Sequence, residues 1–129
     1  MTRAQPSHRA IAKSLRTLAL SLPEAEEDFP WGESVIKVRK KIFVFLGRAE
    51  ETDILSLTVK LPSSAPLALS LPGASPMGYG LGRADWVTFR FEKGMAVPVE
   101  LLRDWILESY RAVAPKRLAS QVMRPTSPG

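Results

Sequence analysis

The sequence predicts a two-layer α+β protein, in which helices from the two ends of the chain cover one face of a mostly antiparallel sheet. Apolar residues recur at helical spacing near both ends of the chain, and runs of β-branched and aromatic residues fill the part between them. The chain has 129 residues, 45% of them hydrophobic, which is enough for one continuous core. We therefore expect a single domain over residues 1–119 and a flexible tail over residues 120–129, where Pro, Ser and Gly are frequent.

The first helix is expected to begin after Ser7, whose side chain can cap it, and to stop at Pro23. Its apolar positions are spaced by four, three and four residues and form one helical stripe: Ile11, Leu15, Leu18 and Leu22. Residues 24–28 follow as an acidic connector. Residues 29–32 are expected to form a turn, because the Pro and Gly they contain are unsuited to a regular central strand.

Three strands are expected next, arranged as an antiparallel meander. Residues 34–38 and 42–46 are rich in β-branched and aromatic side chains, and a short basic turn joins them into a hairpin. Residues 53–60 alternate apolar and polar positions imperfectly, which still favours a third strand. A short helix is expected within residues 62–74, although Pro66 leaves little room for it.

The last part of the chain predicts a loop, a strand and a long helix. Residues 75–83 contain three glycines and are expected to form the loop. Residues 86–91 alternate regularly, with one face apolar, which is typical of a half-buried strand. The final helix can start at Pro98, and its apolar positions step by three, four, four and three residues: Val99, Leu102, Ile106, Tyr110 and Val113.

The residues that carry most enzymatic chemistry are scarce. There is no cysteine, so the chain has no disulfide, thiolate metal site or thiol nucleophile, and His8 is the single histidine. The acidic run of residues 24–28 is the only dense carboxylate group, and we interpret it as a solvated loop. Residues 78–83 lack the ending of a phosphate-binding loop and precede a strand. We expect neither catalysis nor a metal or cofactor.

The location of the protein is expected to be cytoplasmic. Lys13 and Arg16 interrupt the apolar positions that a signal peptide would need. No window reaches the roughly 18 uninterrupted apolar residues of a membrane helix. We expect no association with a membrane, and a monomeric protein.

The formal net charge is +5, and its distribution suggests a ligand. Positive charges gather around the hairpin turn, before the strand at 86–91 and after the last helix, which makes DNA, duplex or single-stranded, a candidate partner. The candidate contacts are Lys37, Arg39, Lys40, Lys41, Arg83, Lys116 and Arg117. Three aromatic residues could stack on an unpaired base if they are exposed: Trp31, Tyr79 and Trp86.

Two other interpretations remain open. In the first, the cations only make a turn soluble and the aromatics belong to the core; composition alone favours this interpretation. Alternatively, the chain is a non-enzymatic module that binds a protein or a small ligand in a cleft formed by the same three aromatics.

Three blocks of the sequence resemble the MmcQ/YjbR family of small proteins. They are LPEAEEDFPWGESVIKVRKKIFVFLGR, GYGLGRADWVTFRF and LLRDWILESYRAVAPKRLA, and the similarity runs from about Leu18 to Ala119. The resemblance implies a fold similar to CyaY and the frataxins, and DNA binding through a double-wing arrangement. Iron binding by acidic residues of the first helix, as in frataxins, is not implied, because this helix carries Arg9, Lys13 and Arg16 on its solvated face.

Overall fold

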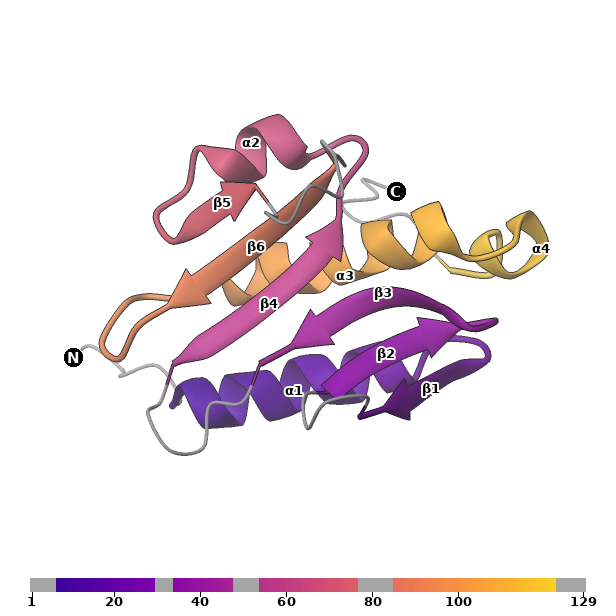
Figure 1. The fold of residues 1–129 in the computed structure, drawn as a ribbon, viewed down its shortest axis with the longest axis horizontal. Coiled ribbons are helices and arrows are strands. Elements are labelled where there is room, and N and C mark those ends of the chain that lie inside the picture. Colours follow the sequence, from indigo (N-terminus) through magenta and orange to yellow (C-terminus); the bar gives the residue numbers. More distant parts are fainter. Residues whose placement is uncertain (1–6, 30–33, 48–53, 77–84, 123–129) are drawn as a thin grey trace.

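The structure, a computed structural model, describes residues 7–29, 34–47, 54–76 and 85–122. Within these ranges, the strands lie in the sequence between helices near the two ends of the chain (Figure 1). In chain order the elements are α1 (His8–Leu20), β1 (Ala25–Asp28), β2 (Ser34–Val38), β3 (Lys41–Leu46), β4 (Leu55–Lys60), α2 (Ala65–Leu69), β5 (Ala74–Pro76), β6 (Trp86–Phe91), α3 (Val99–Val113) and α4 (Lys116–Ala119).

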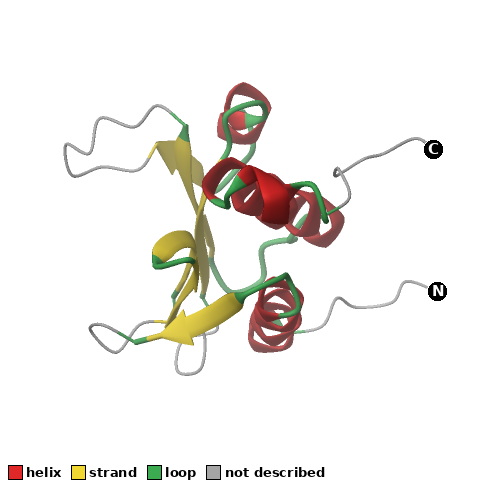
Figure 2. Ribbon diagram, turned by 90° about the vertical axis from the view of Figure 1, so that its right-hand side faces the viewer, coloured by secondary structure: helices red, strands yellow, loops and turns green. Residues whose placement is uncertain are grey.

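The strands form one six-stranded sheet in the order β1-β2-β3-β4-β6-β5, and all of its neighbouring pairs are antiparallel. Strands β2, β3 and β4 make the meander that the sequence predicts. The described helices all lie on one side of the sheet, and none of them covers the other side (Figure 2). The two-layer α+β prediction is therefore confirmed.

The core lies between the sheet and helices α1 and α3. On β6 the predicted alternation is confirmed, since Val87, Phe89 and Phe91 are buried whereas Trp86 is half-buried and faces the other way. Ser7 caps α1 as predicted, by accepting a 3.1 Å hydrogen bond from the Ala10 N–H. These elements follow their periodicity because each buries a single apolar face.

The acidic connector expected at residues 24–28 is instead the edge strand β1. Acidic residues have low β propensity, so the sequence pattern does not indicate a strand there. The strand is stabilised instead by its backbone pairing with β2, in which Ala25 lies opposite Val38 and Asp28 opposite Val35. The strand then exposes Glu26 and Asp28 to solvent.

The short helix expected within residues 62–74 is confined to α2, and β5 follows it. Pro66 is accommodated in the first turn of α2, where a proline costs no hydrogen bond. The Glu108 carboxylate of α3 then accepts hydrogen bonds from the backbone N–H groups of Ser63 and Ser64, at 2.8 and 3.0 Å, and from the Ser64 hydroxyl. A carboxylate from a helix distant in the sequence thus provides hydrogen-bond acceptors for the backbone N–H groups of the turn that leads into α2.

Packing against the domain continues beyond the expected boundary at residue 119. After α3 the chain forms the short helix α4, and Val122 is buried with 7% of its surface exposed. The Arg111 guanidinium donates hydrogen bonds to the carbonyls of Ala119 and Val122, at 2.7 and 2.6 Å. The segment through Val122 therefore packs as part of the domain.

A β-bulge in β3 fixes helix α3 to the centre of the sheet. Ile36 pairs with Val44 and Lys37 with Ile42, so Phe43 is the extra residue, and both Phe43 and Val44 are buried. The Ser109 hydroxyl donates to the Phe43 carbonyl at 2.6 Å and accepts from the Lys60 N–H at 2.9 Å. One buried side chain of α3 thus satisfies two backbone groups on neighbouring strands.

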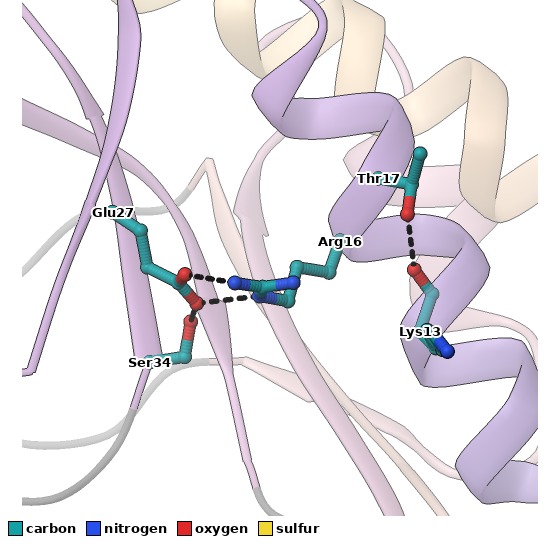
Figure 3. A network of polar contacts seen from close by, with 5 residues as sticks. All are labelled: Lys13, Arg16, Thr17, Glu27 and Ser34. Carbon is teal, nitrogen blue, oxygen red and sulfur yellow. Dashed lines mark hydrogen bonds and ion pairs between the residues drawn. The ribbon is translucent and has the colours of Figure 1, made fainter.

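An ion pair joins α1 to the first two strands (Figure 3). The Arg16 guanidinium donates to both carboxylate oxygens of Glu27, at 2.8 Å from Nε, and the Ser34 hydroxyl donates to the same carboxylate. These hydrogen bonds, that of Arg16 first, hold the pKa of Glu27 below its usual range, although partial burial opposes the shift. On α1 itself, the Thr17 hydroxyl donates to the Lys13 carbonyl.

Replacement of Ser109 by alanine should lower the free energy of unfolding by about 2–3 kcal/mol, because it leaves a buried N–H and a buried C=O without partners. Urea denaturation followed by circular dichroism measures the effect. The matched control is Ser70→Ala, which removes an exposed hydroxyl bonded to the Leu67 carbonyl and should change stability by less than about 0.5 kcal/mol. Equal effects of the two substitutions would contradict the role given to Ser109.

Replacement of Glu27 by glutamine should lower the free energy of unfolding at pH 7 by about 1 kcal/mol. Because the folded-state pKa is depressed, the stabilisation by ionised Glu27 is present above about pH 4.3 and is lost as the pH falls through the folded-state value. Denaturation between pH 7 and pH 3 should therefore show a shallower loss of stability for Glu27→Gln than for the native chain. Glu26→Gln, at an exposed neighbouring site, should keep the native slope, and an unchanged slope for Glu27→Gln would contradict the assignment.

Candidate nucleic-acid interface

The turn between β2 and β3 presents two cations in an unusual backbone conformation. Arg39 and Lys40 have φ angles of 52° and 69°, and Val38 pairs with Lys41 across them. Both central residues thus have positive φ, as in the turn that Asn-Gly pairs favour in hairpins. For residues with a Cβ this conformation costs about 1–2 kcal/mol each. Arginine and lysine occupy the tip at the expense of stability.

The strand register brings further groups to the same end of the sheet. Lys60 is the last residue of β4 and lies beyond the final β3–β4 residue pair, beside the bulge at Phe43. It is paired with Trp86, the first residue of β6. The β2–β3 turn, the end of β4 and the start of β6 therefore lie along one end of the sheet.

Helix α4 lies at this end as well, on the right in Figure 1. The Tyr110 hydroxyl near the end of α3 donates to the Pro23 carbonyl at 2.6 Å, which fixes the end of α3 beside the start of β1. The pKa of Glu24, just before β1, is lowered mainly by its hydrogen bond from Arg39 and to a smaller extent by the charge of Arg117 on α4. We call this group of cations the basic end: Lys37, Arg39, Lys40, Lys41, Lys60, Lys116 and Arg117.

Two cations of the basic end are neutralised by neighbours. Arg39 donates to the Glu24 carboxylate, and this hydrogen bond is the main cause of the lowered pKa of Glu24. Lys37 contacts Asp28 at 3.0 Å. The remaining five form no ion pair with any residue that the structure describes. The basic end therefore keeps a surplus of positive charge.

The predicted site residues fall into two groups. The structure brings six of the seven predicted cations together at the basic end, with Trp86 on the sheet beside them. Arg83, Trp31 and Tyr79 lie outside the described residues. The predicted aromatic cleft therefore stays a prediction, of which only the Trp86 side chain is described.

Trp86 lies on the helix-free face of the sheet. Its ring packs edge-to-face against Phe45, with centroids 5.9 Å apart and planes at 69°. The two residues reach toward each other across β4, over Thr58, which is only 7% exposed. Both rings remain partly exposed.

Phe45 and Lys60 are members of this surface that the sequence patterns did not nominate. Both belong to strands that were expected, but their position beside Trp86 depends on pairings between segments far apart in the chain. Local periodicity carries no signal for such pairings. To find them, one would have to know how the strand at residues 86–91 pairs with the strands before it, and in which register.

A separate shallow groove lies between α2 and α3, with a volume of about 560 Å³. Its apolar lining includes Leu67, which is 58% exposed, and Trp105, which stacks on Phe89 beneath it. Glu108 also lines the groove, but its carboxylate is occupied by the turn before α2. Trp86, the described member of the predicted aromatic cleft, is not among the residues that line this groove.

Other chemistry has little support among the described residues. His8 is buried, and its Nε2 lies 3.0 Å from the Met95 carbonyl, so its position fits a structural role. No group of three or more His, Asp or Glu side chains in the described ranges comes together as a potential metal site. The described helices also include none with the length and apolar character needed to cross a membrane.

Comparisons with known proteins agree with this architecture. The model of the YjbR family matches residues 20–112. A solved Deinococcus radiodurans protein, DR2400, described with the domain DUF419, is 26% identical, with a TM-score of 0.65 and 89% of each chain covered. A solved Pseudomonas syringae protein is 17% identical, with a TM-score of 0.56 over 78% of this chain and 97% of its own, and shares the fold. No curated protein matches this chain.

Replacement of Lys40 by glycine should raise the free energy of unfolding by about 0.5–1 kcal/mol, because glycine adopts positive φ without steric cost but gains freedom in the unfolded chain. The opposite change is available as a control at Gly94, where φ is 90° and, apart from the adjoining residues, no described atom lies within 4 Å of an added Cβ. Gly94→Ala should lower stability by about 1 kcal/mol. Chemical denaturation measures both, and a destabilising Lys40→Gly would refute backbone strain at the turn.

Proposed function

The chain belongs to the YjbR family, and we propose that it binds DNA through the basic end, by weak and mainly electrostatic contacts. The observation that carries the proposal is the convergence of cations from three separate parts of the chain, the β2–β3 turn, the end of β4 and α4. Each cation that neutralises a phosphate releases a condensed counterion, which provides affinity without sequence specificity.

The backbone of the turn supports a functional role for its cations. The turn requires positive φ at both positions, which asparagine and glycine adopt with little strain, whereas Arg39 and Lys40 adopt it at a steric cost. Strain of this kind often accompanies function, because the surrounding structure stabilises what the site requires. The Arg39–Glu24 ion pair holds the tip from one side, while Lys40 stays exposed and unpaired within the described residues.

We propose a binding module without catalysis. The carboxylates that pair with cations of the basic end are Glu24 and Asp28, and their pKa values are lowered by ion pairs with Arg39 and Lys37, respectively. A general acid or base active near neutral pH needs a shift in the opposite direction for a carboxyl group. The geometry therefore favours these carboxylates as partners that orient cations.

Replacement of both Lys40 and Lys41 by alanine should weaken binding to a fluorescent oligonucleotide and reduce its salt dependence. Fluorescence anisotropy across a series of salt concentrations gives log K against log salt. For duplex DNA the magnitude of the slope should fall by about 2, since each lost phosphate contact removes about 0.9.

The matched control is Lys93→Ala, which removes an exposed cation from the turn after β6, at the opposite end of that strand. It should leave both affinity and slope unchanged. The proposal is wrong if the native chain fails to bind any oligonucleotide at low salt, or if the double variant binds as the native chain does.

A further inference from the structure

The face of the sheet without helices is a surface with its own chemistry (Figure 2). Between the acidic edge at β1 and the short strand β5, the central strands direct polar, aromatic and basic side chains to this side. Thr58 and Thr88 join their hydroxyls across β4 and β6 at 2.9 Å, and Phe45 and Trp86 lie next to them. This face continues directly into the basic end.

The Trp86 indole has a free polar group. Its N–H has no hydrogen-bond partner among the described residues, and no buried side-chain nitrogen or oxygen there lacks a partner. The indole N–H therefore reaches solvent, beside an aromatic pair that is itself partly exposed. Such a ring can stack on a flat ligand and donate a hydrogen bond at the same time.

The cations lie at a distance from the aromatic pair that a few nucleotides can span. Lys60 is the register partner of Trp86, and Lys40 lies in the turn that leads into β3, two strands away from β6. Two strand spacings amount to about 10 Å, and stacked nucleotides advance about 3.4 Å each along a strand. About three nucleotides therefore span the distance from Trp86 to the basic turn.

We infer that the ligand of this surface is a single-stranded nucleic acid, with unpaired bases stacked on Trp86 and Phe45 and its phosphates held by Lys60 and Lys40. The inference rests on the proposed function and specifies its ligand. In a duplex the bases are stacked on one another and only their edges are accessible in the grooves, so aromatic rings on an open sheet can stack only on unpaired bases.

One nearby carboxylate opposes this ligand and offers a second test. Asp85 directly precedes Trp86 and has no ion pair among the described residues. Its backbone carbonyl accepts from the Leu61 N–H at 2.7 Å, which fixes the residue at this end of the sheet. Asp85→Asn keeps the backbone contact and removes the charge, so it should tighten binding of a polynucleotide a few-fold.

The experiment measures affinity for a labelled oligonucleotide of about 12 nucleotides, single-stranded or annealed to its complement, in DNA and RNA forms. The native chain should bind the single strand at least about tenfold more tightly than the duplex. Trp86→Leu should weaken single-strand binding about tenfold or more, and Trp86→Phe, which keeps a flat ring, should restore most of it. Comparison of the DNA and RNA forms shows which of the two nucleic acids the surface binds more tightly.

Two controls separate stacking from folding. Phe29→Ala removes an aromatic ring that is 58% exposed at the end of β1, away from the basic turn, and should leave the affinity unchanged. Denaturation of each variant confirms that it is folded. The tryptophan emission quenched by single strand in the native chain should be absent from Trp86→Phe.

The outcomes distinguish this inference from the proposed function. Duplex binding as tight as single-strand binding, or an affinity unaffected by Trp86→Leu, overturns the inference and leaves the electrostatic proposal intact. No binding of either form at low salt overturns both. Looser binding by Asp85→Asn also contradicts the inferred path of the phosphates.

Discussion

The hydrogen bonds of the Ser109 hydroxyl are the contact on which the arrangement of the domain depends. The bulge at Phe43 interrupts the β3–β4 ladder, so one carbonyl and one N–H would be left without partners in the core. Ser109 satisfies both and, by doing so, fixes where α3 crosses the sheet. The following residue, Tyr110, then packs edge-to-face on Phe43 and reaches the Pro23 carbonyl. The positions of α4 and of the start of β1 follow from that crossing.

The same crossing determines the electrostatics of the molecule. Because α3 ends beside the β2–β3 turn, α4 carries Lys116 and Arg117 to the end of the sheet where the hairpin already presents its cations. Glu24 pairs with Arg39, which is the main cause of its lowered pKa, and the charge of Arg117 lowers that pKa further, while the outer lysines are unpaired within the described chain. A moderate net charge of +5 thus becomes a local concentration of positive charge.

The sequence was sufficient to predict the elements that bury a regular apolar face. It was insufficient to predict those that depend on pairing with other strands. Helices α1 and α3 and strands β2, β3 and β6 follow from periodicity. Strand β1 does not, because its acidic residues are held by pairing with β2 and by ion pairs to Arg16 and Lys37. In the candidate site, the cations of the β2–β3 turn are close together in the sequence and were therefore predicted. Their meeting with Lys60 and α4 depends on contacts between residues that are about 50 to 90 positions apart in the chain, and local patterns contain no information on such contacts.

The two edges of the sheet also bear on how the protein behaves when it is crowded. An exposed edge strand offers unpaired backbone groups on which another chain could extend the sheet. Here β1 has only four residues, with Glu26 and Asp28 exposed, and β5 has three and ends in Pro76, which lacks an N–H. Like charges would meet when two copies of β1 approach, and β5 offers too little backbone for a lasting ladder. The acidic strand β1, which the sequence pattern does not indicate, therefore disfavours edge-to-edge association between copies of the protein.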